Sequence, residues 1–235
     1  MHIELNQKEI KKLLQKENPL VLEIGSHIGL DTLRFLEEFK DITIYSFEPD
    51  PRCITFFKEV VKNRRCTLVE AAVANVDGKA LLHLSGGWPS GFKGEWDSIY
   101  GRGDWNASSS IKNSVSNSGE YPWLSFDRTI EVKTVRLDTW TKENDITAVD
   151  FIWADVQGAE REMIEGAVNT LKTVKYLFTE YGETSPYPEA LTRDETIKLL
   201  GQNDFEIVSE YSNEDRKGNL LFKNKRLTGS FGTLW

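Results

Sequence analysis

Three side chains in the sequence have the chemistry to take a proton from a substrate hydroxyl group: Asp155, Glu180 and His27. Asp155 follows the segment 149–154 and Glu180 follows the segment 174–178 and Thr179, and because both segments are rich in apolar residues, each carboxylate is expected at the end of a buried strand. Ligands of open α/β sheets bind beyond such strand ends. We therefore rank Asp155 first, Glu180 second and His27 third as the catalytic base.

A carboxylate of ordinary pKa is a poor base for an alcohol, so a raised pKa or a bound divalent cation has to assist it. Asp155 and Glu180 offer hard oxygen atoms, and we predict them as the ligands if Mg or Mn takes part. Two carboxylates alone do not define a metal site. The structural alternatives are that Asp155 caps the helix before Gly158 and that His27 is a packed or solvated loop residue.

The elements that position these groups begin with the segment 19–31, which predicts a buried strand, a glycine turn and the start of a helix. Gly25 and Gly29 let the backbone turn tightly and approach a ligand, because no Cβ intrudes. The helix opens with unpaired N–H groups. Glu48 follows about 20 residues later, at the end of the next strand, where an acidic side chain can bind ribose hydroxyls. Together these features predict a nucleotide-like ligand.

The turn distinguishes between two classes of cofactor. A dinucleotide fingerprint has the spacing Gly-x-Gly-x-x-Gly, and His27 stands where its middle glycine would be. S-adenosylmethionine (SAM) has no pyrophosphate and needs no such close approach, so we predict SAM, with an NAD-linked oxidoreductase as the alternative. The ribose is expected at Glu48 and the adenine near Ala71 or Ala72. The predicted cofactor contacts are Glu23, Gly25, Ser26, Gly29, Asp31, Glu48, Pro49 and Ala72.

Strands and helices alternate along most of the chain, which predicts an α/β fold with a parallel sheet. We predict one domain over residues 1–235, with a helical cap at 1–18 and an unassigned tail at 226–235. Residues 85–127 are rich in Gly, Ser and Trp, and we predict an insertion that folds over the ligand site, because long loops in compact domains are usually functional. Aromatic rings offer flat faces to a sugar. The predicted substrate contacts are Trp88, Trp105 and Ser110.

The composition restricts the partners and the compartment. The 29 basic and 37 acidic residues give a net charge of −8, which argues against a nucleic-acid partner because such a surface is basic. No apolar run reaches the length of a membrane span, and residues 1–7 lack the pattern of a signal peptide. Cys53 and Cys66 are too few for a disulfide framework. We therefore predict a cytoplasmic protein.

Five segments resemble the FkbM-like family of SAM-dependent methyltransferases, namely 23–31, 47–51, 72–78, 135–140 and 155–160. The resemblance extends over about residues 20–222 and departs from the family pattern at Trp153, where the family often has a lysine. It implies a Rossmann-like methyltransferase fold. That fold has a seven-stranded, mostly parallel sheet, helices on both faces and a C-terminal antiparallel hairpin.

The resemblance also implies methyl transfer to an oxygen atom. The family's association with surface polysaccharides and the tryptophan-rich insertion favour a sugar or glycan hydroxyl as the acceptor. A hydroxyl group of a secondary metabolite is the close alternative. A binding module that keeps the fold without the chemistry is the alternative outside enzymes, and the two acids Asp155 and Glu180 argue against it.

Overall fold

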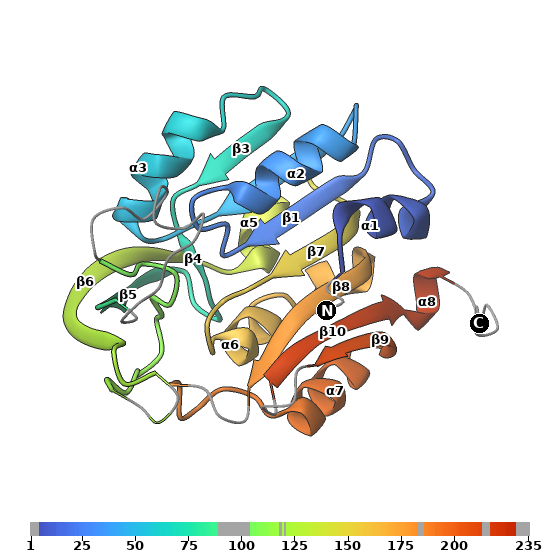
Figure 1. The fold of residues 1–235 in the computed structure, drawn as a ribbon. Coiled ribbons are helices and arrows are strands. Elements are labelled where there is room, and N and C mark those ends of the chain that lie inside the picture. Colours follow the sequence, from blue (N-terminus) through green and yellow to red (C-terminus); the bar gives the residue numbers. More distant parts are fainter. Residues whose placement is uncertain are drawn as a thin grey trace.

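The computed structural model describes residues 5–88, 104–117, 119, 121–182, 186–212 and 217–228. These residues form a seven-stranded sheet with the order β3-β2-β1-β7-β8-β10-β9 (Figure 1). Strands β1, β2, β3, β7 and β8 pair in parallel, and β10 pairs antiparallel with β8 and β9. The predicted α/β fold and C-terminal hairpin are thereby confirmed. The strands are β1 Leu20–Ile24, β2 Thr43–Phe47, β3 Cys66–Val69, β7 Val149–Ala154, β8 Val174–Gly182, β9 Phe205–Ser212 and β10 Lys217–Asn224.

Helices cover both faces of this sheet (Figure 1). Side chains alternate between the faces along β1, so Val21 packs with Phe35 beneath α2, and Leu22 packs with Trp140 of α5 on the opposite face. Helix α1 lies on the α2 face, and α6 and α7 lie on the α5 face. The helices are α1 Gln7–Leu14, α2 Leu30–Glu38, α3 Pro51–Val60, α5 Leu137–Glu143, α6 Glu160–Glu165, α7 Arg193–Gly201 and α8 Lys225–Thr228, with a 3₁₀ turn, η1, at Thr170–Thr173.

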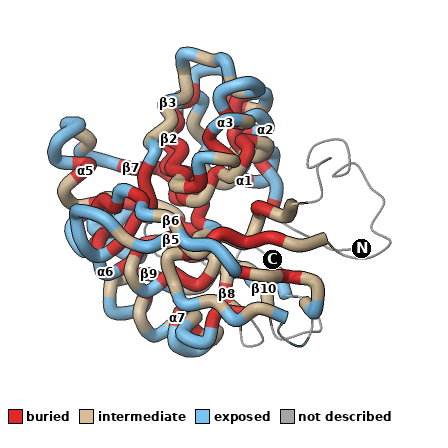
Figure 2. The backbone as a smooth tube through the Cα atoms, turned by 90° about the vertical axis from the view of Figure 1, so that its left-hand side faces the viewer, coloured by how far each residue is buried: buried red, intermediate tan, exposed pale blue. Residues whose placement is uncertain are grey.

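A second, three-stranded sheet carries the predicted insertion. Its order is β4-β6-β5, formed by β4 Ala72–Val73, β5 Gly78–Gly86 and β6 Ser125–Val135. Strands β5 and β6 pair antiparallel, and much of their length is exposed (Figure 2). The segment between the two strands therefore begins after Gly86, the last residue of β5, and ends before Ser125, the first residue of β6. Residues 89–103, 118 and 120 of the insertion lie outside the described residues.

Local sequence signals explain where the helices begin. Asn6 caps α1 by accepting from the backbone N–H of Glu9, and the Glu9 side chain accepts from the N–H of Asn6. Asp50 caps α3, with Pro51 in the first helical position as the sequence predicts. Part of the predicted tail forms α8, and residues 229–235 lie outside the described residues. Within the described ranges, no helix is both long and apolar enough to span a bilayer.

Candidate active site

A cavity opens at the carboxyl ends of β1, β2 and β7. Gly25 follows β1, Glu48 and Pro49 follow β2, Ala72 belongs to β4, and Asp155 follows β7, and all five line this first cavity. The position agrees with the rule that ligands of open α/β sheets bind beyond the carboxyl ends of the strands. Four of the predicted cofactor contacts are therefore gathered around one cavity.

Glu48 holds its carboxyl group in a fixed position in this cavity. The backbone N–H of His27 donates to Oε2 at 2.7 Å, and the N–H of Asp50 donates to Oε1 at 2.8 Å. Burial raises the pKa of Glu48 from 4.5 to about 8. A carboxylate oxygen has room for more than one hydrogen bond, so Glu48 can still bind adjacent hydroxyl groups such as those of a ribose.

The glycine turn packs against the carboxyl ends of β2 and β7. The N–H groups of Gly25 and Ser26 both donate to the carbonyl oxygen of Phe47 at 3.0 Å. Gly25 has a φ of +84°, and a Cβ at this position would stand 1.8 Å from the carbonyl oxygen of Asp155. Both the conformation and the space therefore require glycine. Ser26 Oγ is buried, has no hydrogen-bond partner among the described residues, and lies outside the lining of both cavities.

Glu23 lies on the opposite face of β1 from the core residues Leu22 and Ile24, beneath α2. Its carboxyl group accepts hydrogen bonds from the hydroxyls of Thr32 and Ser46, and it does not line the first cavity. Burial raises the pKa of Glu23 to about 8. Side chains alternate between the two faces of a strand, so Glu23 points to the α2 face while its neighbours Leu22 and Ile24 point to the α5 face.

Gly29 and Asp31 also lie outside the lining of the first cavity. Gly29 packs against α3, where an added Cβ would stand 2.6 Å from the side chain of Val61. Asp31 accepts a hydrogen bond from Arg34 at 2.8 Å. The predicted cofactor contacts of Glu23, Ser26, Gly29 and Asp31 stay predictions.

Asp155 and Glu180 lie side by side at the ends of β7 and β8, which pair in parallel. A hydrogen bond joins the two carboxyl groups. Burial raises the pKa of Glu180 well above its usual value, and the neighbouring charges of Asp155 and Glu160 raise it further. The raised pKa favours the protonated form of Glu180, and Asp155 is the more exposed member of the pair.

His27, the third candidate base, is directed toward the insertion. It has a φ of +51°, and its ring Nε2 lies 2.8 Å from Oδ1 of Asn106. Burial lowers the pKa of His27, so the imidazole is neutral at physiological pH. Because Asn106 presents its oxygen, Nε2 carries the hydrogen and donates it.

The described part of the insertion forms a wall between two cavities. Asn106, Ala107 and residues 109–111 line the first cavity. Trp105, Ala107 and Ser108 line a second cavity, which has a volume of about 310 Å³. Part of the segment 104–111 therefore lies between the two cavities, and the insertion of residues 85–127 over the ligand site stays a prediction.

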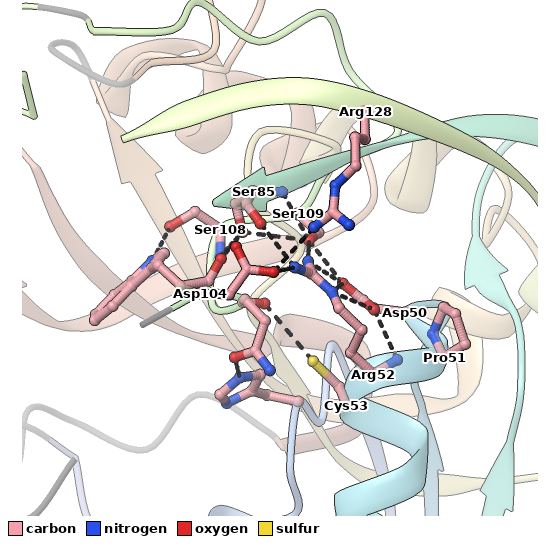
Figure 3. A network of polar contacts seen from close by, with 12 residues as sticks. Asp50, Pro51, Arg52, Cys53, Ser85, Asp104, Ser108, Ser109 and Arg128 are labelled. Carbon is pink, nitrogen blue, oxygen red and sulfur yellow. Dashed lines mark hydrogen bonds and ion pairs between the residues drawn. The ribbon is translucent and has the colours of Figure 1, made fainter. Parts of the chain in front are cut away.

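A network of polar contacts fastens this wall to α3 (Figure 3). Arg52 binds Asp50 at 2.7 Å, Asp104 at 3.2 Å and the hydroxyl of Ser109 at 3.1 Å. The Ser109 hydroxyl in turn donates to Asp50 Oδ2 at 2.8 Å. Arg52 also donates to the carbonyl oxygen of Ser85 at 2.9 Å, so one guanidinium connects α3, β5 and the insertion.

Aromatic and ionisable groups line the second cavity together. Trp105, Tyr121, Trp123 and Tyr187 contribute rings. The centroids of Trp105 and Trp123 lie 5.1 Å apart at an interplanar angle of 74°. The ionisable groups of this lining are Glu160, Glu180 and Lys217, together with the hydroxyls of Tyr121 and Tyr187.

Gln157 lies at the junction of the two cavities, because it lines both. Its Nε2 donates to Oδ1 of Asp155, and its Oε1 accepts from the Tyr187 hydroxyl at 2.9 Å. Its backbone carbonyl oxygen accepts from Ser110 Oγ at 2.7 Å. Gln157 therefore orients the candidate base and ties it to the wall of the insertion.

The three predicted substrate contacts lie in different places. Trp105 lines the second cavity, and Ser110 lines the first. Trp88 lines neither and meets the ring of Trp105 edge-on, at a centroid distance of 6.2 Å. Their contact with substrate stays a prediction.

Several lining residues were not predicted. The sequence signal for Gln157 is its place in the Asp-Val-Gln-Gly turn. The position of Glu160 at the start of α6 indicates a helix N-terminal charge, but its side chain is 3% exposed and lines the second cavity. Tyr187 and Lys217 come from distant segments, and no local pattern indicates them. In the described ranges, no group of three or more His, Cys, Asp or Glu side chains is arranged to hold a metal ion, so the prediction of Mg or Mn finds no support.

Comparison with known proteins identifies the family. The family described as "Methyltransferase FkbM domain" matches residues 23–207. The chain belongs to the FkbM methyltransferase family. It is 34% identical over 221 residues to the 2-O-methyltransferase NoeI of Sinorhizobium fredii strain NBRC 101917 / NGR234, covering 94% of this chain and 85% of NoeI. The predicted family, enzyme class and cofactor are thus confirmed, and this FkbM-family chain is a SAM-dependent methyltransferase.

Solved structures share the fold of the FkbM-family chain at low sequence identity. EvdMO1 matches with a TM-score of 0.50 and 11% identity, covering 93% of this chain and 40% of that one. Magnesium protoporphyrin IX methyltransferase (ChlM) of Synechocystis PCC 6803, solved with bound SAM, matches with a TM-score of 0.48 and 10% identity, covering 93% and 79%.

Proposed function

We propose that this methyltransferase transfers the methyl group of SAM to a hydroxyl oxygen of a sugar or glycan. The observation that carries the proposal is the placement of the Asp155–Glu180 pair between a first cavity suited to SAM and a second, aromatic cavity. NoeI, which covers nearly the same length, is named as a 2-O-methyltransferase. Aromatic walls suit the apolar face of a sugar ring.

The residues of the first cavity fit the cofactor. Glu48 lies where the ribose hydroxyls would bind, and Ala72 lies where the adenine would rest. Gly25 has no Cβ, so the end of β1 packs directly against the Asp155 carbonyl, and both residues line the cavity. When bound, SAM supplies a methyl group on a positively charged sulfur as the electrophile.

Asp155 would take the proton of the acceptor hydroxyl as that oxygen receives the methyl group that bound SAM would supply. Glu180, whose raised pKa favours the protonated carboxyl, donates a hydrogen bond to Asp155. Gln157 holds Asp155 at the junction of the cavities through its hydrogen bond to Oδ1. The wall formed by residues 104–111 keeps water away from the reacting atoms.

Calorimetry and one substitution test this proposal. The protein should bind S-adenosylhomocysteine and not NAD. Asp155→Asn should retain this affinity within about twofold and lose roughly a hundredfold or more in methyl transfer, the usual contribution of a general base. The matched control is Asp127→Asn, an exposed position on β6 outside both cavities. Methyl transfer by Asp155→Asn at the normal rate would remove Asp155 from the mechanism.

The predicted Mg or Mn at Asp155 and Glu180 has a separate test. Exhaustive treatment with a chelator should abolish methyl transfer, and added Mg or Mn should restore it, if a cation takes part. Unchanged activity after chelation would show that methyl transfer needs no divalent cation. The absence of a nucleic-acid partner and the cytoplasmic location, inferred from the net charge of −8 and the two cysteines, stay predictions.

A further inference from the structure

We propose that Tyr187 is a positioning residue for methyl transfer, which acts through Gln157 to hold the candidate base Asp155 in its ionised form. This inference rests on the proposed function and adds to it a residue from the segment between β8 and α7. The side chain of Tyr187 is 5% exposed and lines the second cavity. It does not line the first cavity, so its role can be separated from cofactor binding.

The hydroxyl group of Tyr187 meets two acceptors. It lies 2.6 Å from the carbonyl oxygen of Ser108 and 2.9 Å from Oε1 of Gln157. Neither oxygen atom can donate, so the hydroxyl has to donate, and its single hydrogen is shared between them. Burial raises the pKa of Tyr187 well above its usual value, so the phenol keeps this hydrogen.

The amide group of Gln157 has a donor end and an acceptor end of nearly the same shape. With Oε1 toward the hydroxyl of Tyr187, Nε2 faces Asp155 and donates to its Oδ1. The reverse orientation would place the amide oxygen against the carboxyl oxygen of Asp155. A hydrogen bond donated to a carboxylate favours its ionised form, which is the form that can accept a proton. Tyr187 therefore selects the amide orientation that suits a base.

The backbone at Gln157 is also held in a specific conformation. Gln157 has a φ of +52°, which is unfavourable for a residue with a side chain, and Ser110 Oγ donates to its carbonyl oxygen at 2.7 Å. A Cβ on the next residue, Gly158, would stand 2.7 Å from the Cβ of Tyr187, so Tyr187 packs directly on this turn. Strained backbone persists where the surrounding contacts fix it, and it is frequent at active sites.

Contacts with the insertion hold the segment that carries Tyr187. The backbone N–H of Val115 donates to the carbonyl oxygen of Pro186 at 2.9 Å. The ammonium group of Lys112 forms an ion pair with Glu189 at 2.6 Å. The insertion therefore fixes where the hydroxyl of Tyr187 lies.

A titration of carboxyl groups by nuclear magnetic resonance tests the inference without an acceptor. The protein carries ¹³C in its aspartate carboxyl groups and is saturated with S-adenosylhomocysteine, and Asp155→Asn identifies the signal of Asp155. Tyr187→Phe removes the hydroxyl and keeps the ring. It should raise the lower pKa of the Asp155–Glu180 pair by about half a unit or more, because the ionised form loses its oriented donor. Affinity for S-adenosylhomocysteine should stay normal.

A double-mutant cycle separates this role from a purely structural one. Gln157→Ala removes the donor itself and should raise the same pKa, and Tyr187→Phe should add nothing further in that background. The control is Tyr176→Phe, a partly buried position on β8 outside both cavities, which should leave the pKa unchanged. No shift in Tyr187→Phe, no shift in Gln157→Ala, or equal effects of Tyr187→Phe with and without Gln157 would overturn the proposal.

Methyl transfer gives a second readout. The acceptor probes are the neutral methyl glycosides of glucose, galactose, mannose and fucose, and the one that binds best to the protein saturated with S-adenosylhomocysteine is used. In Tyr187→Phe, kcat should fall by about tenfold while KM changes by less than about threefold, and an unchanged kcat would contradict the proposal. Failure to bind S-adenosylhomocysteine, or to methylate any glycoside, would instead count against the proposed function, and the carboxyl titration would still decide the role of Tyr187.

Discussion

Two buried acids illustrate how the same residue type can serve different purposes in one fold. Glu48 lines the first cavity and accepts from two backbone N–H groups. Glu23 lies beneath α2 and accepts from two hydroxyls. Burial raises the pKa of both to about 8. We therefore expect substitution of Glu48 to affect ligand binding and substitution of Glu23 to affect stability.

Removing Glu48 should weaken cofactor binding. Glu48→Ala deletes the acceptor expected to bind ribose and leaves the N–H groups of His27 and Asp50 without a partner, a loss of about 1–3 kcal/mol per unpaired group. We expect the affinity for S-adenosylhomocysteine, measured by calorimetry, to fall by more than about tenfold. Asp127→Asn again serves as the control, and normal affinity in Glu48→Ala would refute the ribose assignment.

Glu23 should make folding stability depend on pH. Its pKa is about 8 in the folded protein and 4.5 in its ordinary state, so the folded state retains a proton that the unfolded state releases. The stabilisation is therefore complete below about pH 4.5 and is lost as the pH rises through about 8. Glu23→Gln stays neutral, so its stability relative to the unsubstituted protein should improve as the pH rises.

Urea unfolding at a series of pH values measures this difference directly. Glu37→Gln, an exposed position on α2, is the control. A stability difference between Glu23→Gln and the unsubstituted protein that stays constant with pH would contradict the buried, neutral carboxyl.

At the scale of elements, the glycine turn and the insertion wall set the shape of the first cavity. The turn brings β1 against the end of β7, and the wall is fastened to α3 through Arg52. Substitutions should disturb both arrangements. The turn depends on the missing Cβ of Gly25, and the wall depends on the single guanidinium of Arg52, which several partners share.

Gly25→Ala should destabilise the fold by at least about 2 kcal/mol, because the left-handed φ of +84° and the Asp155 carbonyl at 1.8 Å both oppose a Cβ. Gly201→Ala, where a Cβ meets nothing within 4 Å, should be neutral or slightly stabilising. The melting temperatures of both variants, measured by thermal unfolding, test these two predictions. Equal melting temperatures would show that the two strand ends move apart more freely than the structure indicates.

The wall should respond to the cofactor. Asn106, Ala107 and residues 109–111 line the first cavity, so bound S-adenosylhomocysteine should slow hydrogen–deuterium exchange in this segment and leave β9 unchanged. Arg52→Ala removes contacts to Asp50, Asp104 and Ser109 and should speed exchange there in the free protein. Exchange that is insensitive to both changes would refute the role of the wall.

At the scale of the molecule, local patterns predicted the fold better than the site. The strand, turn and helix from Leu20 onward, and Glu48 after β2, follow from alternation and glycine chemistry within one segment. The second cavity draws on β8, β10, α6 and the insertion, which meet only in the folded chain. Glu23 is predicted as a cofactor contact from its place in the motif, whereas the hydrogen bond from Thr32 lies beneath α2, so its contact with the cofactor stays a prediction.

The central claim is that the chain moves a methyl group from SAM to a sugar oxygen. The most direct test incubates the protein with SAM labelled in its methyl group and with the neutral glycoside that binds best, then locates the label by nuclear magnetic resonance. The account predicts label on an oxygen of the sugar, and its loss with Asp155→Asn. Label on nitrogen or carbon, or no label on any glycoside despite binding of both ligands, would contradict it.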